Sequence, residues 1–176
     1  MLMKVLVIIV SYNFEPWIER CLGSLRLSKY PIDTVVIDNG SKDQTIQRIQ
    51  KDYPEIRLLP QNENLGFGRA NNIGMKIALT EGYDFVFLLN QDAWIDSNTI
   101  GKLVELSQSH PQYGIFSPVH LTGKGDKPDP GFGHYAQIQQ LSQLPENEIL
   151  PIPFANAAFW MIPISVLKKV GGFCPL

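Results

Sequence analysis

Short apolar runs alternate with segments of helical periodicity along most of the chain. Runs with the length of buried strands lie at 4–10, 33–37, 56–59 and 84–89, and 115–117 could be a fifth. Between them, apolar residues recur every three or four positions at 15–27, 42–51, 66–80 and 98–109, which predicts helices. Ser41 is available as the N-cap of the second helix. This order predicts an α/β fold, Rossmann-like, with a mostly parallel sheet and helices on both faces.

The pattern changes after about Gly123. Residues 123–133 are rich in Gly, Pro, Asp and Lys, which predicts a loop, and the Gln-rich segment 137–143 could be exposed or a mobile flap. Residues 155–162 then predict a strand, and 163–170 a short helix that stops at two glycines. There is no internal repeat, so a single domain over 1–176 is expected.

Polar groups follow the first four predicted strands. They are Ser11-Tyr12-Asn13, Asp38-Asn39-Gly40-Ser41, Asn62-Glu63-Asn64 and Asn90-Gln91-Asp92. Right-handed crossovers bring the carboxyl ends of parallel strands to one edge of the sheet, where open α/β sheets bind ligands. We therefore expect these groups to gather there.

Two carboxylates in these groups are candidates for ligand contact. Asp92 could hold a divalent metal and, through it, a phosphate, or it could only start a loop or cap a helix. Asp38 could accept hydrogen bonds from a ribose or a base N–H, and it could also form a local Asx-turn.

Composition and charge argue against a nucleic-acid-binding, disulfide-linked or membrane-spanning protein. The 176 residues are 44% apolar and 18% charged with a net charge of −2, and no basic block suggests nucleic acid. Cys21 and Cys174 lack metal-ligand spacing, and two buried thiols are favoured over a disulfide. The amino end lacks a charged start and a cleavage site, and no apolar run approaches the roughly 20 residues that span a bilayer. A cytoplasmic protein that could still contact a membrane surface is expected.

Known nucleotide-binding loops are not matched. The third helix begins Gly66-Phe67-Gly68, but Asn71 occupies the place of the third glycine, and the segment follows the third strand rather than the first. This disfavours a nicotinamide dehydrogenase, and the phosphate-loop motif is missing from the sequence. Arg69 could approach a phosphate or be an ordinary surface residue. Asp126 and Asp129 lie among glycines and prolines, where a role in turns is the default.

Five segments stand out together. They are Val10-Ser11-Tyr12-Asn13, then 36–43 with Asp38-Asn39-Gly40-Ser41, 62–74 with Asn64-Leu65-Gly66-Phe67-Gly68, 88–92 ending in Asn90-Gln91-Asp92, and 156–162 followed by Val170-Gly171-Gly172-Phe173. In this order they resemble the family 2 inverting glycosyltransferases, which adopt the GT-A fold and include rhamnosyltransferase-like branches. Together they cover nearly the whole chain.

The resemblance implies transfer of a sugar, with inversion, from a nucleotide-diphosphate sugar to a hydroxyl of a glycan or lipid-linked acceptor, in polysaccharide or cell-surface glycan synthesis. It implies a divalent cation, Mg or Mn. Residues 1–122 would form the nucleotide-sugar half and 123–176 the start of the acceptor half.

The same resemblance assigns roles to residues. Asp92 would be the last acid of the family's Asp-x-Asp motif and would bind the metal, with Asn90 in place of the first acid. The other donor-side residues would be Ser11, Tyr12, Asn13 and Asp38 for base and ribose, and Asn64, Gly66, Arg69 and Asn71 along the nucleotide pocket. Asn156 and Trp160 would face the acceptor, although the apolar neighbours of Trp160 favour a place in the core.

The family's general base lies in an acidic segment shortly after Gly-Gly-Phe. We expect it beyond Leu176, so that this chain binds donor but transfers little sugar, and apolar surface uncovered by truncation could lead to homo-oligomers. Two alternatives stay open. A nucleotidyltransferase would want a Gly-rich basic loop after the first strand, which residues 11–15 do not provide, and the chain could be a non-catalytic nucleotide-binding or assembly module.

Overall fold

The computed structural model describes residues 2–144 and 149–174. The chain divides into two compact units, one formed by Met1–Phe116 with Ala157–Leu176 and the other by Ser117–Asn156. Each unit has its own apolar cluster. The units are therefore described separately.

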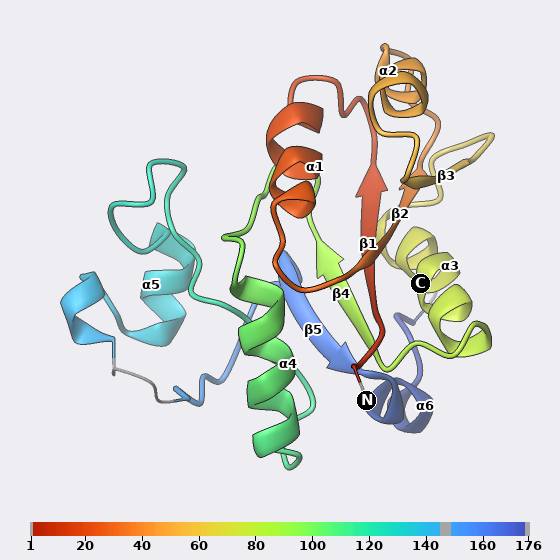
Figure 1. The fold of residues 1–176 in the computed structure, drawn as a ribbon. Coiled ribbons are helices and arrows are strands. Elements are labelled where there is room, and N and C mark those ends of the chain that lie inside the picture. Colours follow the sequence, from red (N-terminus) through yellow and green to blue (C-terminus); the bar gives the residue numbers. More distant parts are fainter. Residues whose placement is uncertain (1, 145–148, 175–176) are drawn as a thin grey trace. The chain divides into compact units, whose positions relative to one another are not determined.

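Within its described residues, the first unit is built on a sheet of five strands in the order β3-β2-β1-β4-β5. The strands are β1 (Val5–Ser11), β2 (Asp33–Asp38), β3 (Arg57–Pro60), β4 (Phe85–Leu89) and β5 (Phe159–Pro163). The first four are parallel, and β5 runs antiparallel to β4 (Figure 1). The predicted class, α/β with a mostly parallel sheet, is confirmed.

The predicted strand at 115–117 is wrong. Phe116 makes only an isolated bridge with Met161 of β5. In an antiparallel ladder the next bonded pairs would involve Pro118 on one side and Pro163 on the other, and neither has an N–H to donate, so the pairing does not extend. The edge position is taken by β5, whose first residue, Phe159, lies later than the predicted start at 155.

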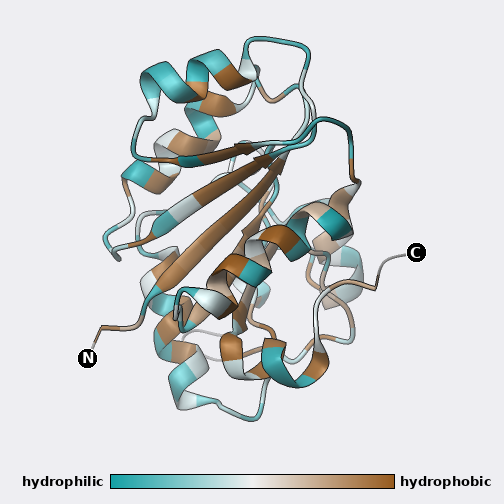
Figure 2. Ribbon diagram, turned by 90° about the vertical axis from the view of Figure 1, so that its right-hand side faces the viewer, coloured by the Kyte–Doolittle hydropathy of each residue, from teal (hydrophilic) through white to brown (hydrophobic). Residues whose placement is uncertain are grey.

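In the part of the chain that the structure describes, five helices cover both faces of this sheet. They are α1 (Ile18–Arg26), α2 (Thr45–Asp52), α3 (Phe67–Thr80), α4 (Thr99–Ser109) and α6 (Ile164–Val170). Figure 1 shows α1 and α4 on one side of the sheet and α3 and α6 on the other. The strands are hydrophobic along most of their length (Figure 2), as expected of strands buried on both faces.

The helix α3 lies directly on β1. Ile8 is fully buried in the cluster that α3 and α6 form with the sheet. A Cβ added at Gly74 would stand 2.6 Å from Ile8 Cγ2, so only glycine allows this close approach. This contact fixes the distance between α3 and the central strand.

Two helices begin later than the periodicity predicts. Ser41 is not the N-cap of α2, because its hydroxyl donates to the Asp38 carboxylate. Asp43 then accepts from the N–H of Thr45 at 3.0 Å and forms the turn that precedes the helix. In the same way, the N–H of Trp17 donates to the carbonyl of Phe14, so α1 starts only at Ile18.

The second unit contains α5 (Pro130–Ala136) and a short 3₁₀ helix, η1 (Leu141–Gln143). Phe132, Ala136 and Ile138 form its small core. The predicted loop at 123–133 is therefore wrong from Pro130 onward. Asp129 caps α5 by accepting from the N–H groups of Gly131 and Phe132, which makes a helix out of a segment whose composition suggests a loop. Part of the predicted flap, 137–143, is exposed, but Ile138 within it is buried.

Two further observations concern the chain as described. No helix in residues 2–144 or 149–174 has the length and apolar character needed to cross a membrane. Cys21 and Cys174 are not joined in a disulfide, as expected, and Cys21 is buried. Cys174 is exposed, so the expectation that both thiols are buried is wrong for this residue.

Candidate functional site

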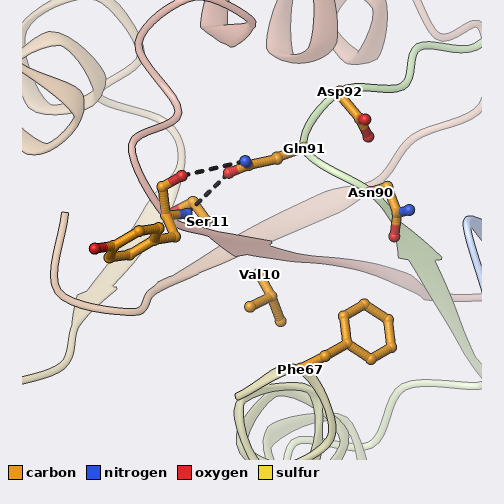
Figure 3. Close-up of a pocket in the computed structure, with 7 residues that line it drawn as sticks. Val10, Ser11, Phe67, Asn90, Gln91 and Asp92 are labelled. Atoms are coloured by element: carbon orange, nitrogen blue, oxygen red, sulfur yellow. Dashed lines mark hydrogen bonds between the residues drawn. The ribbon is translucent and has the colours of Figure 1, made fainter. Parts of the chain in front are cut away.

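A pocket of about 250 Å³ opens at the carboxyl edge of the parallel strands (Figure 3). Three segments line it: the end of β1 and its loop, the first residue of α3, and the loop after β4. The lining residues are Val10, Ser11, Tyr12, Phe67, Asn90, Gln91 and Asp92. Since β1 and β4 are neighbours in the sheet, their loops meet at the position where α/β sheets bind ligands.

Gln91 ties the two strand-end loops together. Its Oε1 accepts from the N–H of Tyr12 at 2.9 Å, and its Nε2 donates to the carbonyl of Tyr12 at 3.2 Å. Figure 3 shows Gln91 directed toward the loop after β1, with Asn90 and Asp92 on the opposite side. The Asn90 amide and the exposed Asp92 carboxylate therefore line the pocket with oxygen atoms that could bind a ligand. The amide of Gln91 is already used in its two bonds to Tyr12.

Asp38 is fully buried and bonds to Ser11, which lines the pocket. Its Oδ1 accepts from the hydroxyls of Ser11, at 2.9 Å, and Ser41. Its Oδ2 accepts from the N–H groups of Gly40, at 3.2 Å, and Ser41, at 3.0 Å. These four bonds use the acceptor sites of a carboxylate, so Asp38 holds the end of β1 to the loop after β2. Its bonds from Gly40 and Ser41 form the local turn that the sequence suggested. Contact of Asp38 with a base or ribose stays a prediction.

Asn13 strengthens the same connection. It adopts a positive φ of 51°, its N–H donates to Ser41 Oγ at 2.9 Å, and its Oδ1 accepts from the N–H of Lys42 at 2.9 Å. The backbone N–H and the side-chain oxygen of this exposed residue therefore both serve the turn. Tyr12, the residue before it, is 45% exposed and reaches the pocket.

Of the segment 64–71, only Phe67 lines the pocket. Asn64 accepts from the N–H of Gly66 at 2.9 Å, and Gly66, at φ 77°, precedes the first turn of α3. Asn71 is buried and donates to the carbonyl of Phe67 at 3.0 Å, and Arg69 is exposed. The predicted donor contacts of these four residues, Asn64, Gly66, Arg69 and Asn71, stay predictions.

The two predicted acceptor-side residues fall in different units. Asn156 is the last residue of the second unit. Trp160 belongs to β5, pairs with Leu88 of β4 and packs against the core of the first unit. Its ring stacks on Phe173, with centroids 6.2 Å apart. The core position that the sequence favoured for Trp160 is therefore observed, and its acceptor role stays a prediction.

Three pocket residues were not among the sequence candidates: Val10, Phe67 and Gln91. Val10 and Phe67 are apolar, and nothing in their immediate sequence separates them from core residues. Gln91 stands between two candidates, Asn90 and Asp92, which was a usable signal. Its role depends on Tyr12, 79 positions away, and is visible only in the fold.

Two side chains of α1, Cys21 and Arg20, contact the loop after β4. Burial, and to a smaller extent the Asp92 carboxylate, raises the pKa of the Cys21 thiol far above its ordinary value, so Cys21 is a neutral side chain. The Arg20 guanidinium stacks over the Trp94 ring at 3.4 Å from its centroid. No three His, Cys, Asp or Glu side chains within the described residues come together as a metal site. Among the residues that the structure describes, Asp92 is the one charged residue that lines this pocket.

Solved structures with similar folds include glycosyltransferases. A mannosyltransferase from Pyrobaculum calidifontis, solved with GDP-Man and Mn²⁺, has a TM-score of 0.71 and 22% identity, over 97% of this chain and 47% of that one. TarS 1-349 from Staphylococcus aureus gives 0.70 and 23%, over 95% of this chain and 49% of that one. These matches show that the fold is GT-A.

Relatives are also found by sequence. An N-acetylglucosaminyl-diphospho-decaprenol L-rhamnosyltransferase of Mycobacterium tuberculosis is 34% identical over 122 residues, which is 64% of this chain and 40% of the relative. The poly(ribitol-phosphate) beta-N-acetylglucosaminyltransferase TarS of Staphylococcus aureus is 32% identical over 132 residues, which is 70% of this chain and 22% of TarS. The chain thus spans less than half the length of either relative.

The family model for glycosyl transferase family 2 matches residues 6–171, which include every strand-end loop of the pocket. The resemblance seen in the sequence motifs is therefore confirmed, and the chain belongs to glycosyl transferase family 2.

Proposed function

We propose that this chain binds a nucleotide-diphosphate sugar as part of an enzyme that transfers the sugar, with inversion, to a hydroxyl of a glycan or lipid-linked acceptor. The observation that carries the proposal is the pocket at the carboxyl edge, where the Asp92 carboxylate lies beside Asn90 at the ends of β1 and β4. The relatives' names support it, since one is a rhamnosyltransferase whose name includes a diphospho-decaprenol and the other an N-acetylglucosaminyltransferase.

Different pocket residues would bind different parts of the donor. The half-exposed rings of Tyr12 and Phe67, at 45% and 44%, offer apolar faces for the nucleoside. Asn90 offers an amide for a hydroxyl or phosphate oxygen. A structure of TarS, 28% identical to this chain over 64% of its length with a TM-score of 0.57, contains UDP-GlcNAc, which supports a nucleotide-sugar donor.

The residues present fit a Mg or Mn ion that is shared with the donor diphosphate. Mg²⁺ is usually held by one or two carboxylates together with substrate phosphates, so the single carboxylate of Asp92 suffices, with Asn90 as a neutral oxygen donor. A cation bound there would neutralise the charge that develops on the diphosphate leaving group.

Activation of the acceptor hydroxyl needs a general base. Asp92 is assigned to the cation. Asp126 accepts from the Thr122 hydroxyl at 2.7 Å, and Asp129 caps α5, so both serve local structure in the second unit. We therefore assign donor binding to this chain and no base to its pocket residues.

Titration calorimetry tests the proposal. UDP, dTDP and GDP are titrated, each with MnCl₂ and with EDTA, into the wild-type chain, the Asp92→Asn variant and a Glu105→Gln control. Glu105 is an exposed carboxylate on α4, so its variant has the same change of charge.

At least one nucleotide should bind the wild type and the control equally in Mn²⁺. Asp92→Asn should weaken that binding at least about tenfold and have little effect in EDTA. Failure of all three nucleotides to bind the folded wild type would overturn the proposal. Equal affinity of Asp92→Asn and wild type in Mn²⁺ would remove Asp92 from the cation site.

A further inference from the structure

The side chain of Asn72 clamps the backbone of Phe173, a residue 101 positions later in the chain. Its Oδ1 accepts from the N–H of Phe173 at 2.8 Å, and its Nδ2 donates to the carbonyl of the same residue at 2.8 Å. One amide thus satisfies both backbone groups of Phe173 in the way that a neighbouring strand would. Asn72 lies on α3 and does not itself line the pocket.

Gly172 is shaped to this clamp. A Cβ built at Gly172 would lie 2.3 Å from Asn72 Oδ1 and 3.0 Å from its Cγ, so an alanine there could be accommodated only if the amide moved. Gly171, at φ 81°, ends α6 and turns the chain toward α3. The two glycines of the Gly-Gly-Phe segment therefore have separate structural reasons, a turn and a close approach.

The ring of Phe173 connects the Asn72 clamp to the pocket, because it packs against the pocket-lining ring of Phe67. It packs edge-on against Phe67, with centroids 5.5 Å apart and an interplanar angle of 71°, and stacks on Trp160 on another side. A Cβ added at Gly68 would lie 3.1 Å from Phe173 Cβ, so the first turn of α3 also rests on this residue. Phe67 is the pocket-lining member of this row of three rings.

We propose that Asn72 is a positioning residue for the donor pocket. By fixing the backbone of Phe173, it fixes the ring against which Phe67 packs, and so sets the place of the aromatic wall that faces the loops of Tyr12 and Asp92. This role rests on the proposed function of the pocket. Truncation of Asn72 leaves the polar groups of Phe173 without this partner, and Phe173 then leaves the aromatic row.

Three variants probe the clamp from both sides: Asn72→Ala, Gly172→Ala and the double variant. Asn72→Ala removes the amide, whereas Gly172→Ala pushes it away. In the double variant the added Cβ no longer meets an amide, so its effect should equal that of Asn72→Ala alone rather than the sum of the two. Lys76→Ala, exposed on the same helix, is the surface control, and Ile100→Val, fully buried in α4, is a control for loss of stability without loss of the clamp.

Two separate measurements report on the environment of Trp160, next to the clamp, and on the nucleotide affinity of the pocket. The chain has three tryptophans, so ¹⁹F spectra of protein labelled with 5-fluorotryptophan should show three lines, and Trp160→Phe assigns the one of interest. Calorimetry with Mn²⁺ and the nucleotide diphosphate that binds the wild type gives the affinity.

Asn72→Ala and Gly172→Ala should each shift the Trp160 line, leave the Trp17 and Trp94 lines in place, and weaken nucleotide binding about tenfold. Both controls should bind like the wild type. Should Asn72→Ala not fold, Gly172→Ala provides the same test, because it displaces the amide without removing it.

Wild-type affinity in a folded clamp variant, an unmoved Trp160 line, or additive effects in the double variant would overturn the positioning role and leave the proposed function intact. A wild-type chain that binds no nucleotide diphosphate would instead overturn the proposed function, and the positioning role with it.

Discussion

Replacement of Gly74 by alanine tests how closely α3, the helix whose first residue lines the pocket, packs on the sheet. The new Cβ would lie 2.6 Å from Ile8 Cγ2 and 2.9 Å from both Cγ1 and Cδ1. Ile8 has little room to move, because it is fully buried in β1, which is hydrogen-bonded to β2 and β4. Either α3 must rise from the sheet or Ile8 must leave its rotamer.

The expected cost follows from two opposing effects. Overpacking in a core costs about 1–3 kcal/mol, and a site flanked by paired strands belongs near the upper end. Alanine is favoured over glycine in a helix by about 1 kcal/mol. The free energy of unfolding should therefore fall by about 2 kcal/mol in Gly74→Ala. The matched control is Gly23→Ala on α1, where the added Cβ meets nothing within 4 Å, and it should stabilise the protein by up to about 1 kcal/mol.

Urea unfolding, followed by circular dichroism, measures these differences. The decisive comparison is with Ile8→Ala, which removes the three clashing atoms and itself costs about 2–5 kcal/mol. In that background Gly74→Ala should become stabilising by about 1 kcal/mol, so the sign of its effect reverses. An equal cost of Gly74→Ala in both backgrounds, or no cost in the wild type, would refute the close seating of α3 on β1.

Three further predictions concern single side chains. Burial lowers the pKa of His120 to about 4 from its ordinary value near 6.5, so protonation favours the unfolded chain between these values. The free energy of unfolding, measured with urea, should therefore be highest above about pH 6.5 and fall as the pH is lowered toward 4. The His120→Phe variant should lose this part of the pH dependence. An unchanged pH profile in that variant would contradict the burial of His120 as its cause. Ellman's reagent should modify exposed Cys174 quickly and buried Cys21 only after unfolding, and equal native rates would contradict the burial of Cys21. Gln91→Ala should weaken nucleotide binding about tenfold in EDTA as well as in Mn²⁺, because it frees the loop of Tyr12 rather than removing a cation ligand, and calorimetry showing a loss only in Mn²⁺ would refute that role.

Periodicity predicted the fold well where neighbours in sequence decide the structure. The runs at 4–10, 33–37 and 84–89 became β1, β2 and β4, since buried parallel strands are apolar on both faces and need no special partner to be recognised. Helix starts were less accurate. Ser41 resembles a helix cap in sequence, but its hydroxyl bonds to Asp38 at the end of β2. Asp43 accepts from the N–H of Glu15 in the loop after β1, and α2 begins only at Thr45.

For the site too, the sequence predicted the features that depend on local pattern and missed those that depend on distant contacts. The polar strand ends placed Ser11, Tyr12, Asn90 and Asp92 at one pocket, because right-handed crossovers collect the carboxyl ends of parallel strands at one edge. For Asp38 the sequence suggested the local turn that its bonds from Gly40 and Ser41 form. The fourth bond, from the Ser11 hydroxyl 27 positions away at the end of β1, could not be seen in advance.

The amino-acid sequence by itself thus determined the class of fold, the family and the edge at which the pocket lies. Only the tertiary structure decided which polar side chains face that pocket and which hold the protein together. Gln91 meets Tyr12 across 79 positions and Asn72 meets Phe173 across 101. Sequence patterns report local geometry, whereas hydrogen bonds of this range depend on how α3 and the strand-end loops pack, and so they appear only when the chain is folded.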